Sequence, residues 1–128
     1  MIKAWFSKRQ RGEQAESQAA AWLGQQGLTL VMSNYHCRQG EIDLVMEDQD
    51  TLVFVEVRYR ASRAYGGALA SVTKSKQQRI SRAARHFLAR KPAYSEYACR
   101  FDVLAMEPDA SGAVDYEWVR NAFYEPGH

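Results

Sequence analysis

The sequence predicts a single α/β domain whose elements follow the order αβββαβ(β) around a mixed sheet. Its 128 residues, of which 46% are hydrophobic, suit one domain with a sizeable core and leave no room for a second. Two segments with helical spacing of apolar residues flank three strand-like segments, and further strand-like segments follow the second helix. We therefore treat residues 1–128 as one domain.

The first helix is predicted over residues 12–24, because apolar residues recur there at helical spacing and glycines follow. Its buried stripe consists of Ala15, Ala19, Trp22 and Leu23. Strands are predicted over residues 28–32, 41–46 and 52–58. The last two strands form a hairpin, because only a polar turn at residues 47–50 separates them.

The second helix is predicted over residues 74–90, with Pro92 beyond its end. Its buried stripe consists of Ile80, Ala83, Ala84, Phe87 and Leu88. A strand over residues 100–106 should lie parallel to residues 52–58, because a helical crossover returns the chain to the same sheet. A last strand is expected at about residues 115–120.

Composition excludes several classes of protein. No run approaches the roughly 18 apolar residues of a membrane span, and the first residues lack the apolar stretch of a signal peptide. We therefore expect a cytoplasmic protein without a membrane partner. Cys37 and Cys99 lie in unrelated segments, which argues against a zinc site and a disulfide, and we expect both to be small core residues.

The small net charge of +2 conceals a separation of charge along the chain. Residues 58–91 contain ten basic residues and no acidic one, whereas the rest of the chain has 7 basic and 15 acidic residues. A block of one sign favours a polyanionic partner, of which nucleic acid is the obvious candidate. The alternative is a basic face that keeps the protein soluble or contacts its own acidic segments.

Two carboxylates should converge in the predicted hairpin. Period 2 places Glu56 and Arg58 on the same face as Leu52 and Phe54. A turn centred near Gln49 then places Asp43 opposite or diagonal to Glu56, with the side chains about 5 to 7 Å apart. Such a pair can share a proton, lose a charge through a raised pKa, or coordinate a divalent cation, and oxygen ligands suit Mg²⁺ or Mn²⁺.

Glu16 is a candidate third acid, because it borders the buried stripe of the first helix, whereas Glu13 lies further toward solvent. Taken singly, each of these acids is more often a structural or solvated carboxylate than a ligand. The structural alternative for the strand is an ion pair between Arg58 and Glu56 on one face.

The combined motifs resemble a known superfamily. An acid on a first helix, then Gly40-Glu41-Ile42-Asp43, then Phe54-Val55-Glu56-Val57-Arg58, resembles the PD-(D/E)xK nucleases, whose restriction-endonuclease-like core is αβββαβ. More closely, about residues 8–106 are similar to the YraN-like family of small bacterial proteins, itself similar to archaeal Holliday junction resolvases. The matching pieces are Arg11-Gly12, Ala15-Glu16, residues 40–44, residues 52–58, Val72 with Lys76 and Ile80, and Arg100-Phe101-Asp102-Val103.

The resemblance implies a metal-dependent endonuclease. Asp43 and Glu56 would bind Mg²⁺ or Mn²⁺, with the Val57 carbonyl as a further ligand and Glu16 as the helix acid. The superfamily has a lysine two residues after the second acid, where this chain has Arg58. An arginine is always protonated, so it can stabilise a phosphate but cannot act as a general base.

The basic block would then hold the sugar-phosphate backbone of DNA, which is favoured over RNA. The candidate nucleic-acid-binding residues are Arg60, Arg63, Lys74, Lys76, Arg79, Arg82 and Arg85. Two alternatives stay open: a noncatalytic nucleic-acid-binding module, and a domain that binds an acidic protein. A resolvase-like geometry implies a homodimer, because a four-way junction has two symmetric cuts, although no segment is a clear interface.

Overall fold

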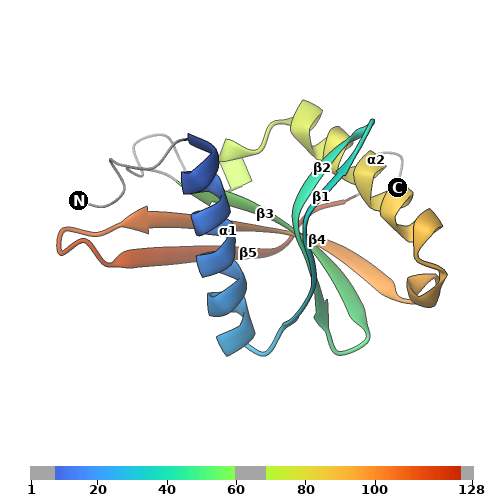
Figure 1. Ribbon diagram of the computed structural model, residues 1–128, viewed down its shortest axis with the longest axis horizontal. Helices are drawn as coiled ribbons and strands as arrows, with labels where there is room; N and C mark the ends of the chain where they lie inside the picture. The colour runs from blue at the N-terminus through green and yellow to red at the C-terminus, as the bar shows by residue number, and fades with distance from the viewer. Residues whose placement is uncertain (1–7, 60–68, 125–128) are drawn as a thin grey trace.

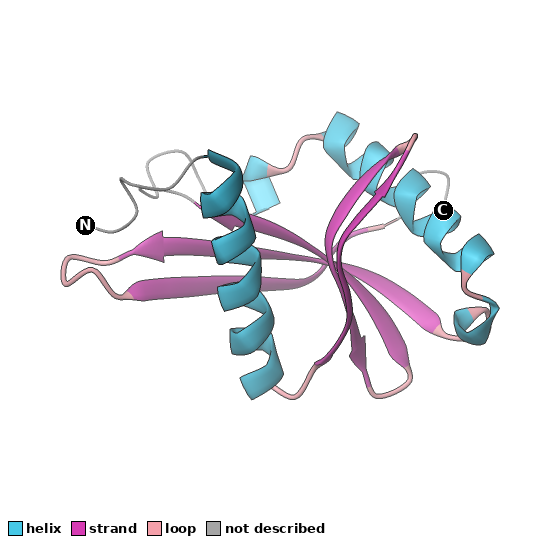
Figure 2. Cartoon of the chain, in the orientation of Figure 1, coloured by secondary structure: helices cyan, strands magenta, loops and turns pink. Residues whose placement is uncertain are grey.

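A computed structural model describes residues 8–59 and 69–124 of the chain (Figure 1). The first helix is α1 (Lys8–Gln25), followed by strands β1 (Thr29–Cys37), β2 (Gly40–Asp48) and β3 (Thr51–Tyr59). A short 3₁₀ turn, η2 (Leu69–Ser71), precedes helix α2 (Lys74–Arg90), and a second, η3 (Pro92–Tyr94), follows it. Strands β4 (Ala98–Pro108) and β5 (Val114–Phe123) complete the domain (Figure 2).

The five strands form one mixed sheet in the order β1-β2-β3-β4-β5. Strands β3 and β4 are parallel, with Glu56 beside Val103, and the other neighbouring pairs are antiparallel. The helical crossover through α2 accounts for the parallel pair. The predicted fold class, element order and parallel pair are therefore confirmed.

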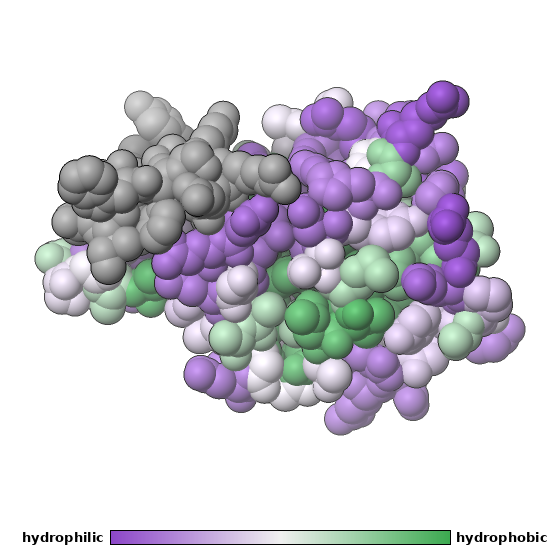
Figure 3. Space-filling model, viewed as in Figure 1, coloured by the Kyte–Doolittle hydropathy of each residue, from purple (hydrophilic) through white to green (hydrophobic). Residues whose placement is uncertain are grey.

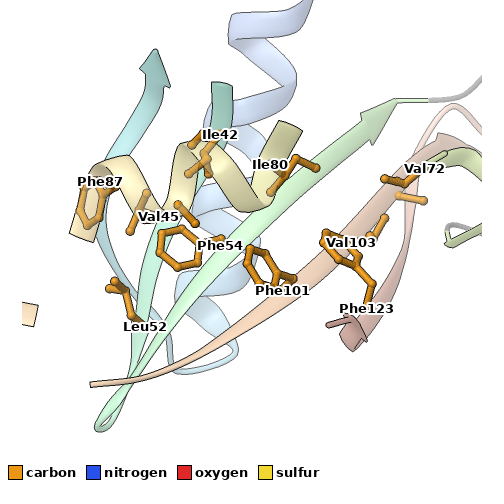
Figure 4. Packing of buried hydrophobic residues seen from close by; sticks show 13 residues of the cluster. Ile42, Val45, Leu52, Phe54, Val72, Ile80, Phe87, Phe101, Val103 and Phe123 are labelled. Atoms are coloured by element: carbon orange, nitrogen blue, oxygen red, sulfur yellow. The ribbon is translucent and has the colours of Figure 1, made fainter. Parts of the chain in front are cut away.

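The two helices cover opposite faces of the sheet, and each face has its own hydrophobic core. On the α2 side, Leu52 and Phe54 of β3 pack with Ile80 and Phe87 of α2 (Figure 4). On the α1 side, the alternate residues Val53 and Val55 pack in a second cluster. That cluster also contains Ala15, Ala19 and Leu23 of α1. The period-2 reading of this strand is thus confirmed, and it places Glu56 on the α2 side.

Some elements are longer than the sequence pattern predicts. Strand β1 continues to Cys37, although its apolar run ends at Met32. The residues of β1 after Met32 are exposed or half-buried, because β1 is an edge strand. Backbone pairing with β2 holds them in place, so their hydrophobic pattern does not reveal the strand. Asn34 has a positive φ of 57°, which further disturbs the alternation. The expectation that both cysteines are small core residues was wrong: Cys99 is exposed, and Cys37 is only half-buried at the edge of the core on the α2 side.

A buried carboxylate fixes β5 against β4. Asp102 is fully buried and accepts hydrogen bonds from Arg100 Nε at 3.1 Å, Trp118 Nε1 at 3.0 Å and the Asn121 backbone N–H at 2.9 Å. Arg100 Nη1 also donates to Asp48 at 3.0 Å. The motif Arg100-Phe101-Asp102-Val103 therefore has a structural role, in which several donors compensate a charge held away from water.

Candidate active site

Asp43 lies where β2 separates from β3. The antiparallel pairing of the two strands begins with Asp48 opposite Thr51 and ends with Leu44 opposite Val55. Beyond this last pair, the Val57 backbone N–H donates to Asp43 Oδ2 at 2.8 Å, so a side-chain oxygen takes the place of a backbone acceptor on β2. This hydrogen bond holds the Asp43 carboxylate beside β3 at the position expected to face Glu56.

Gly40 allows the start of β2 to pack closely against α2. A Cβ atom built on Gly40 would lie 2.8 Å from the Arg79 carbonyl oxygen of α2, which is closer than real Cβ atoms approach. Only glycine therefore lets the turn between β1 and β2 pack this tightly against the helix. The glycine of the Gly40-Glu41-Ile42-Asp43 motif thus serves packing that positions the acid three residues later.

Glu56 is almost completely buried and faces two cations. Its side chain is 4% exposed, and Oε2 lies 3.4 Å from Arg58 Nη1 and 3.8 Å from Lys76 Nζ. Lys76 belongs to the first turn of α2, where the hydroxyl of the N-cap residue Thr73 accepts a hydrogen bond from the Lys76 backbone N–H at 3.1 Å. The helix cap therefore fixes the backbone that carries the second cation.

A cavity of about 580 Å³ brings the predicted site residues together. Glu16 reaches it from α1, Asp43 from β2, Glu56 from β3 and Lys76 from α2. Its described lining residues are Gly12, Gln14, Ala15, Glu16, Gln18, Glu41, Asp43, Glu56, Val57, Arg58, Tyr59 and Lys76. The cavity thus brings together six residues singled out in the sequence, namely Glu16, Asp43, Glu56, Val57, Arg58 and Lys76.

Burial and mutual repulsion favour the protonated forms of the acids. Burial, and then the charge of Asp43, raise the pKa of Glu56 to about 8, although Lys76 and Arg58 oppose the shift. Burial and Asp43 likewise raise the pKa of the half-buried Glu16 to about 7. Burial also raises the pKa of Asp43, against the hydrogen bond from Val57. Hydrogen bonding between the two carboxyl groups raises the pKa of Glu56 and lowers that of Asp43.

Comparison with known proteins identifies the family. A family model described as "Uncharacterised protein family UPF0102" matches residues 15–106. The chain belongs to the UPF0102 family. This agrees with the YraN-like resemblance of the sequence.

Relatives in the UPF0102 family match nearly the whole chain. A UPF0102 protein of Alcanivorax borkumensis is 59% identical over 118 residues, which are 92% of this chain and 94% of that protein. A UPF0102 protein of Nitrosomonas eutropha is 50% identical over 119 residues, or 93% and 97% of the two chains. One of Pseudomonas syringae is 44% identical over 117 residues, or 91% and 95%. Their names state no activity.

Arg58 of this UPF0102 chain is tied to the segment that precedes α2. Its Nη2 donates to the Ser71 carbonyl oxygen at 2.6 Å, and its Nε donates to Ser71 Oγ at 3.4 Å. The remaining nitrogen, Nη1, donates to Glu56 Oε2 at 3.4 Å. The ion pair expected under the structural alternative is therefore present, and Arg58 also fastens η2 to β3. Sequence reasoning missed Ser71, for which no local pattern gives a signal.

The predicted nucleic-acid-binding residues divide into three groups. Lys76 lines the acidic cavity. Lys74, Arg79, Arg82 and Arg85 are exposed on α2, in a region where Figure 3 shows mainly hydrophilic surface. Arg79 and Lys76 also line a groove of about 250 Å³ beside the turn between β1 and β2. Arg60 and Arg63 lie outside the described residues.

The chemistry of the cavity suits a hard divalent cation. Within residues 8–59 and 69–124, no group of three or more His, Cys, Asp or Glu side chains is arranged to hold a metal ion. Mg²⁺ is commonly bound by only one or two carboxylates, with water and substrate phosphate completing its shell. The Asp43 and Glu56 pair, whose repulsion a cation would relieve, fits that mode of binding.

The described part of the chain contains no helix long and apolar enough to cross a membrane.

Proposed function

We propose that this UPF0102 protein is a divalent-metal-dependent endonuclease that hydrolyses DNA phosphodiester bonds, including those of branched or junction DNA. The observation that carries the proposal is the set of three interacting carboxyl groups in one cavity beside two cations. Membership of the PD-(D/E)xK superfamily, a cytoplasmic location and a homodimer belong to the same proposal.

Asp43 and Glu56 would hold Mg²⁺ or Mn²⁺, and Glu16 and the Val57 carbonyl are the further candidate ligands. When bound, such a cation supplies electrophilic stabilisation of a phosphate oxygen and lowers the pKa of a water molecule. The chain itself orients the first acid, because the Val57 N–H fixes Asp43 Oδ2. It also buries Glu56 away from bulk water, and electrostatic interactions are stronger in that less polar environment.

Lys76 and Arg58 have different roles in this proposal. The Lys76 ammonium lies 3.8 Å from Glu56 Oε2, so it can stabilise negative charge that develops on a phosphate in the cavity. Arg58 is permanently charged and bonded to Ser71, so it contributes positive charge and orders η2 but cannot remove a proton. The exposed basic residues of α2 would hold the DNA backbone without reading its sequence, and binding should weaken steeply with salt.

A noncatalytic nucleic-acid-binding module is the second candidate function. It is supported by the arginine at the position of the usual lysine and by the engagement of that arginine with Ser71 and Glu56. This function keeps the basic face of α2 and predicts salt-sensitive binding without cleavage.

The test is cleavage of junction, flap and linear DNA with Mg²⁺ or Mn²⁺. Wild type should cut, whereas Asp43→Asn and Glu56→Gln, which preserve side-chain volume, should lose at least about a hundredfold in rate. Asp50→Asn removes an acid from the exposed turn of the same hairpin and is the matched control. Equal rates for all four proteins would reject the nuclease, and salt-sensitive binding without cutting by wild type would establish the binding module.

A further inference from the structure

A groove of about 250 Å³ lies where the turn between β1 and β2 packs against α2, and we call it the turn groove. Figure 1 shows this turn beside the first half of the helix. The described residues that line the turn groove are His36, Cys37, Gly40, Glu41, Lys76 and Arg79. Glu41 and Lys76 also line the acidic cavity, so the two sites adjoin.

Backbone packing holds the walls of the turn groove in place. His36 pairs with Glu41, and Cys37 pairs with Gly40, across the two strands that the turn connects. A Cβ atom built on Gly40 would lie 3.2 Å from the Arg79 Cβ and 2.8 Å from the Arg79 carbonyl oxygen, so the turn contacts the helix backbone directly. The shape of the groove is therefore set by the fold, which reduces the entropy that a ligand loses by ordering its site.

Helix α2 brings two positive charges to the turn groove. Lys76 and Arg79 are three residues apart and so lie on the same side of the helix. Arg79 is exposed, and within residues 8–59 and 69–124 no carboxylate forms an ion pair with it. Arg58 and Arg100, by contrast, both have carboxylate partners. The Arg79 guanidinium is therefore available to a ligand.

His36 offsets the one carboxylate that borders the turn groove. Its Nδ1 lies 3.1 Å from Glu41 Oε2, so the pair holds the imidazole ring beside the groove and leaves Nε2 as the other ring nitrogen. A carboxylate on one ring nitrogen and an anion on the other favour the cationic imidazolium, in which both nitrogens donate. His36, Lys76 and Arg79 can thus all donate to an anion in the groove.

The chemistry of the groove suits a phosphate group. An arginine donates to two phosphate oxygens at once, and a lysine adds a positive charge beside them. No Phe, Tyr or Trp is among the described residues that line the groove, so it offers no ring on which a base would stack. Because the groove adjoins the acidic cavity, a strand with one phosphate in that cavity would place a neighbouring phosphate here.

We propose that the turn groove binds a backbone phosphate of nucleic acid, next to the phosphate that enters the acidic cavity. This inference rests on the proposed function for its substrate class. It adds His36, which lies outside the basic block of the sequence, to the residues that contact nucleic acid. It also directs the strand from the acids across the turn between β1 and β2.

The experiment follows the binding of single-stranded pentathymidylate to the full chain by NMR titration of backbone amides, at low salt and in EDTA. The backbone amide signals of Cys37 and Gly40 should move, whereas that of Asp50, at the far end of β2, should not. A pentamer with the same bases and uncharged methylphosphonate linkages should leave all three signals unchanged. Equal shifts with this neutral pentamer would overturn the inference, and so would tighter binding of pentaglutamate, which would assign the groove to an acidic protein.

Two substitutions test the side chains of the groove. His36→Gln and Arg79→Met should each weaken pentathymidylate binding about two- to tenfold, the range for a charged contact that is partly exposed to solvent. Lys91→Met also removes one positive charge but lies beyond the end of α2, so it is the control and should bind as wild type does. Thermal unfolding of each variant verifies that it is folded. Equal affinities for all four proteins would overturn the inference.

The binding measurement is independent of cleavage, because EDTA removes divalent metal ions. Phosphate-dependent shifts at the turn groove in a protein that cuts no DNA would reject the nuclease and keep the groove as a nucleic-acid contact. Cleavage by a protein whose turn groove does not respond to pentathymidylate would keep the nuclease and reject this inference.

Discussion

Neutralising Glu56 should change how the stability of the metal-free protein depends on pH. The folded protein holds a proton on Glu56 up to a pKa of about 8, whereas the reference pKa of that group is 4.5. Between these values the native state binds more protons than the unfolded state, so stability is greatest below pH 4.5 and falls as pH rises toward 8. Glu56→Gln should remove this contribution.

The magnitude follows from linkage. One proton bound only by the native state changes the free energy of unfolding by about 1.4 kcal/mol per pH unit. From pH 5 to 7 the buried Glu56 would therefore lower stability by at most about 3 kcal/mol, which is on the order of 10 °C in Tm for a domain of this size. Glu16 acts in the same direction but contributes less, because it is half-exposed and solvent screens its charge.

The assay is thermal unfolding followed by circular dichroism in EDTA from pH 5 to 8. Glu56→Gln should show a shallower decline of Tm than wild type and a higher Tm at pH 8. Glu96→Gln, which changes an exposed acid outside the cavity, is the control and should follow wild type. Parallel pH profiles for wild type and Glu56→Gln would refute the claim that burial and repulsion hold a proton on Glu56.

Three further predictions concern the framework of the site. Lys76→Met should lower the cleavage rate about a hundredfold, because it removes a cation next to Glu56. The control Lys91→Met, at the other end of α2, should cut at the wild-type rate, and equal rates for the two variants would exclude Lys76 from the reaction. Gly40→Ala should lower the free energy of unfolding by about 1–3 kcal/mol, because the added methyl group collides with the Arg79 carbonyl oxygen. Urea titration measures this change, and an unchanged unfolding midpoint would contradict the contact. Asp102→Ala should lower the free energy of unfolding by about 3–5 kcal/mol in the same assay, because it leaves the partly buried Arg100 without a main partner. A loss of stability below about 1 kcal/mol would contradict this structural role of Asp102.

Sequence periodicity predicted the parts of the fold that depend on one element and its exposed and buried faces. Alternation in residues 52–58 correctly separated the two faces of β3. Helical spacing placed Ala15, Ala19 and Leu23 in the core and Glu16 at its border, where the structure has them. These residues were predictable because burial of apolar side chains repeats with the period of the element.

Contacts between distant segments were not predictable in the same way. The position of Asp43 depends on where β2 stops pairing with β3. The sequence around Asp43 continues the strand pattern, so it does not reveal that point. The approach of Gly40 to Arg79 and the attachment of Arg58 to Ser71 join segments that no local period relates. Pairing of Arg58 with Glu56 was foreseeable because they are two residues apart on one face.

The acidic cavity exists only when the whole domain is assembled, because its acids and cations come from α1, β2, β3 and α2. Bringing the carboxyl groups together opposes folding, because burial and mutual repulsion disfavour their charged forms and raise the pKa values of Glu16 and Glu56. The two hydrophobic cores must offset that cost. If the acids were merely structural, Glu56→Gln at pH 8, where about half of the Glu56 side chains are ionised, would leave Arg58 and Lys76 without that partner charge and destabilise the protein. If they form a site for a cation, neutralisation should stabilise the metal-free protein and abolish its response to Mg²⁺. The sign of the change in Tm for Glu56→Gln, measured with and without Mg²⁺, therefore separates a functional site from a structural ion-pair network.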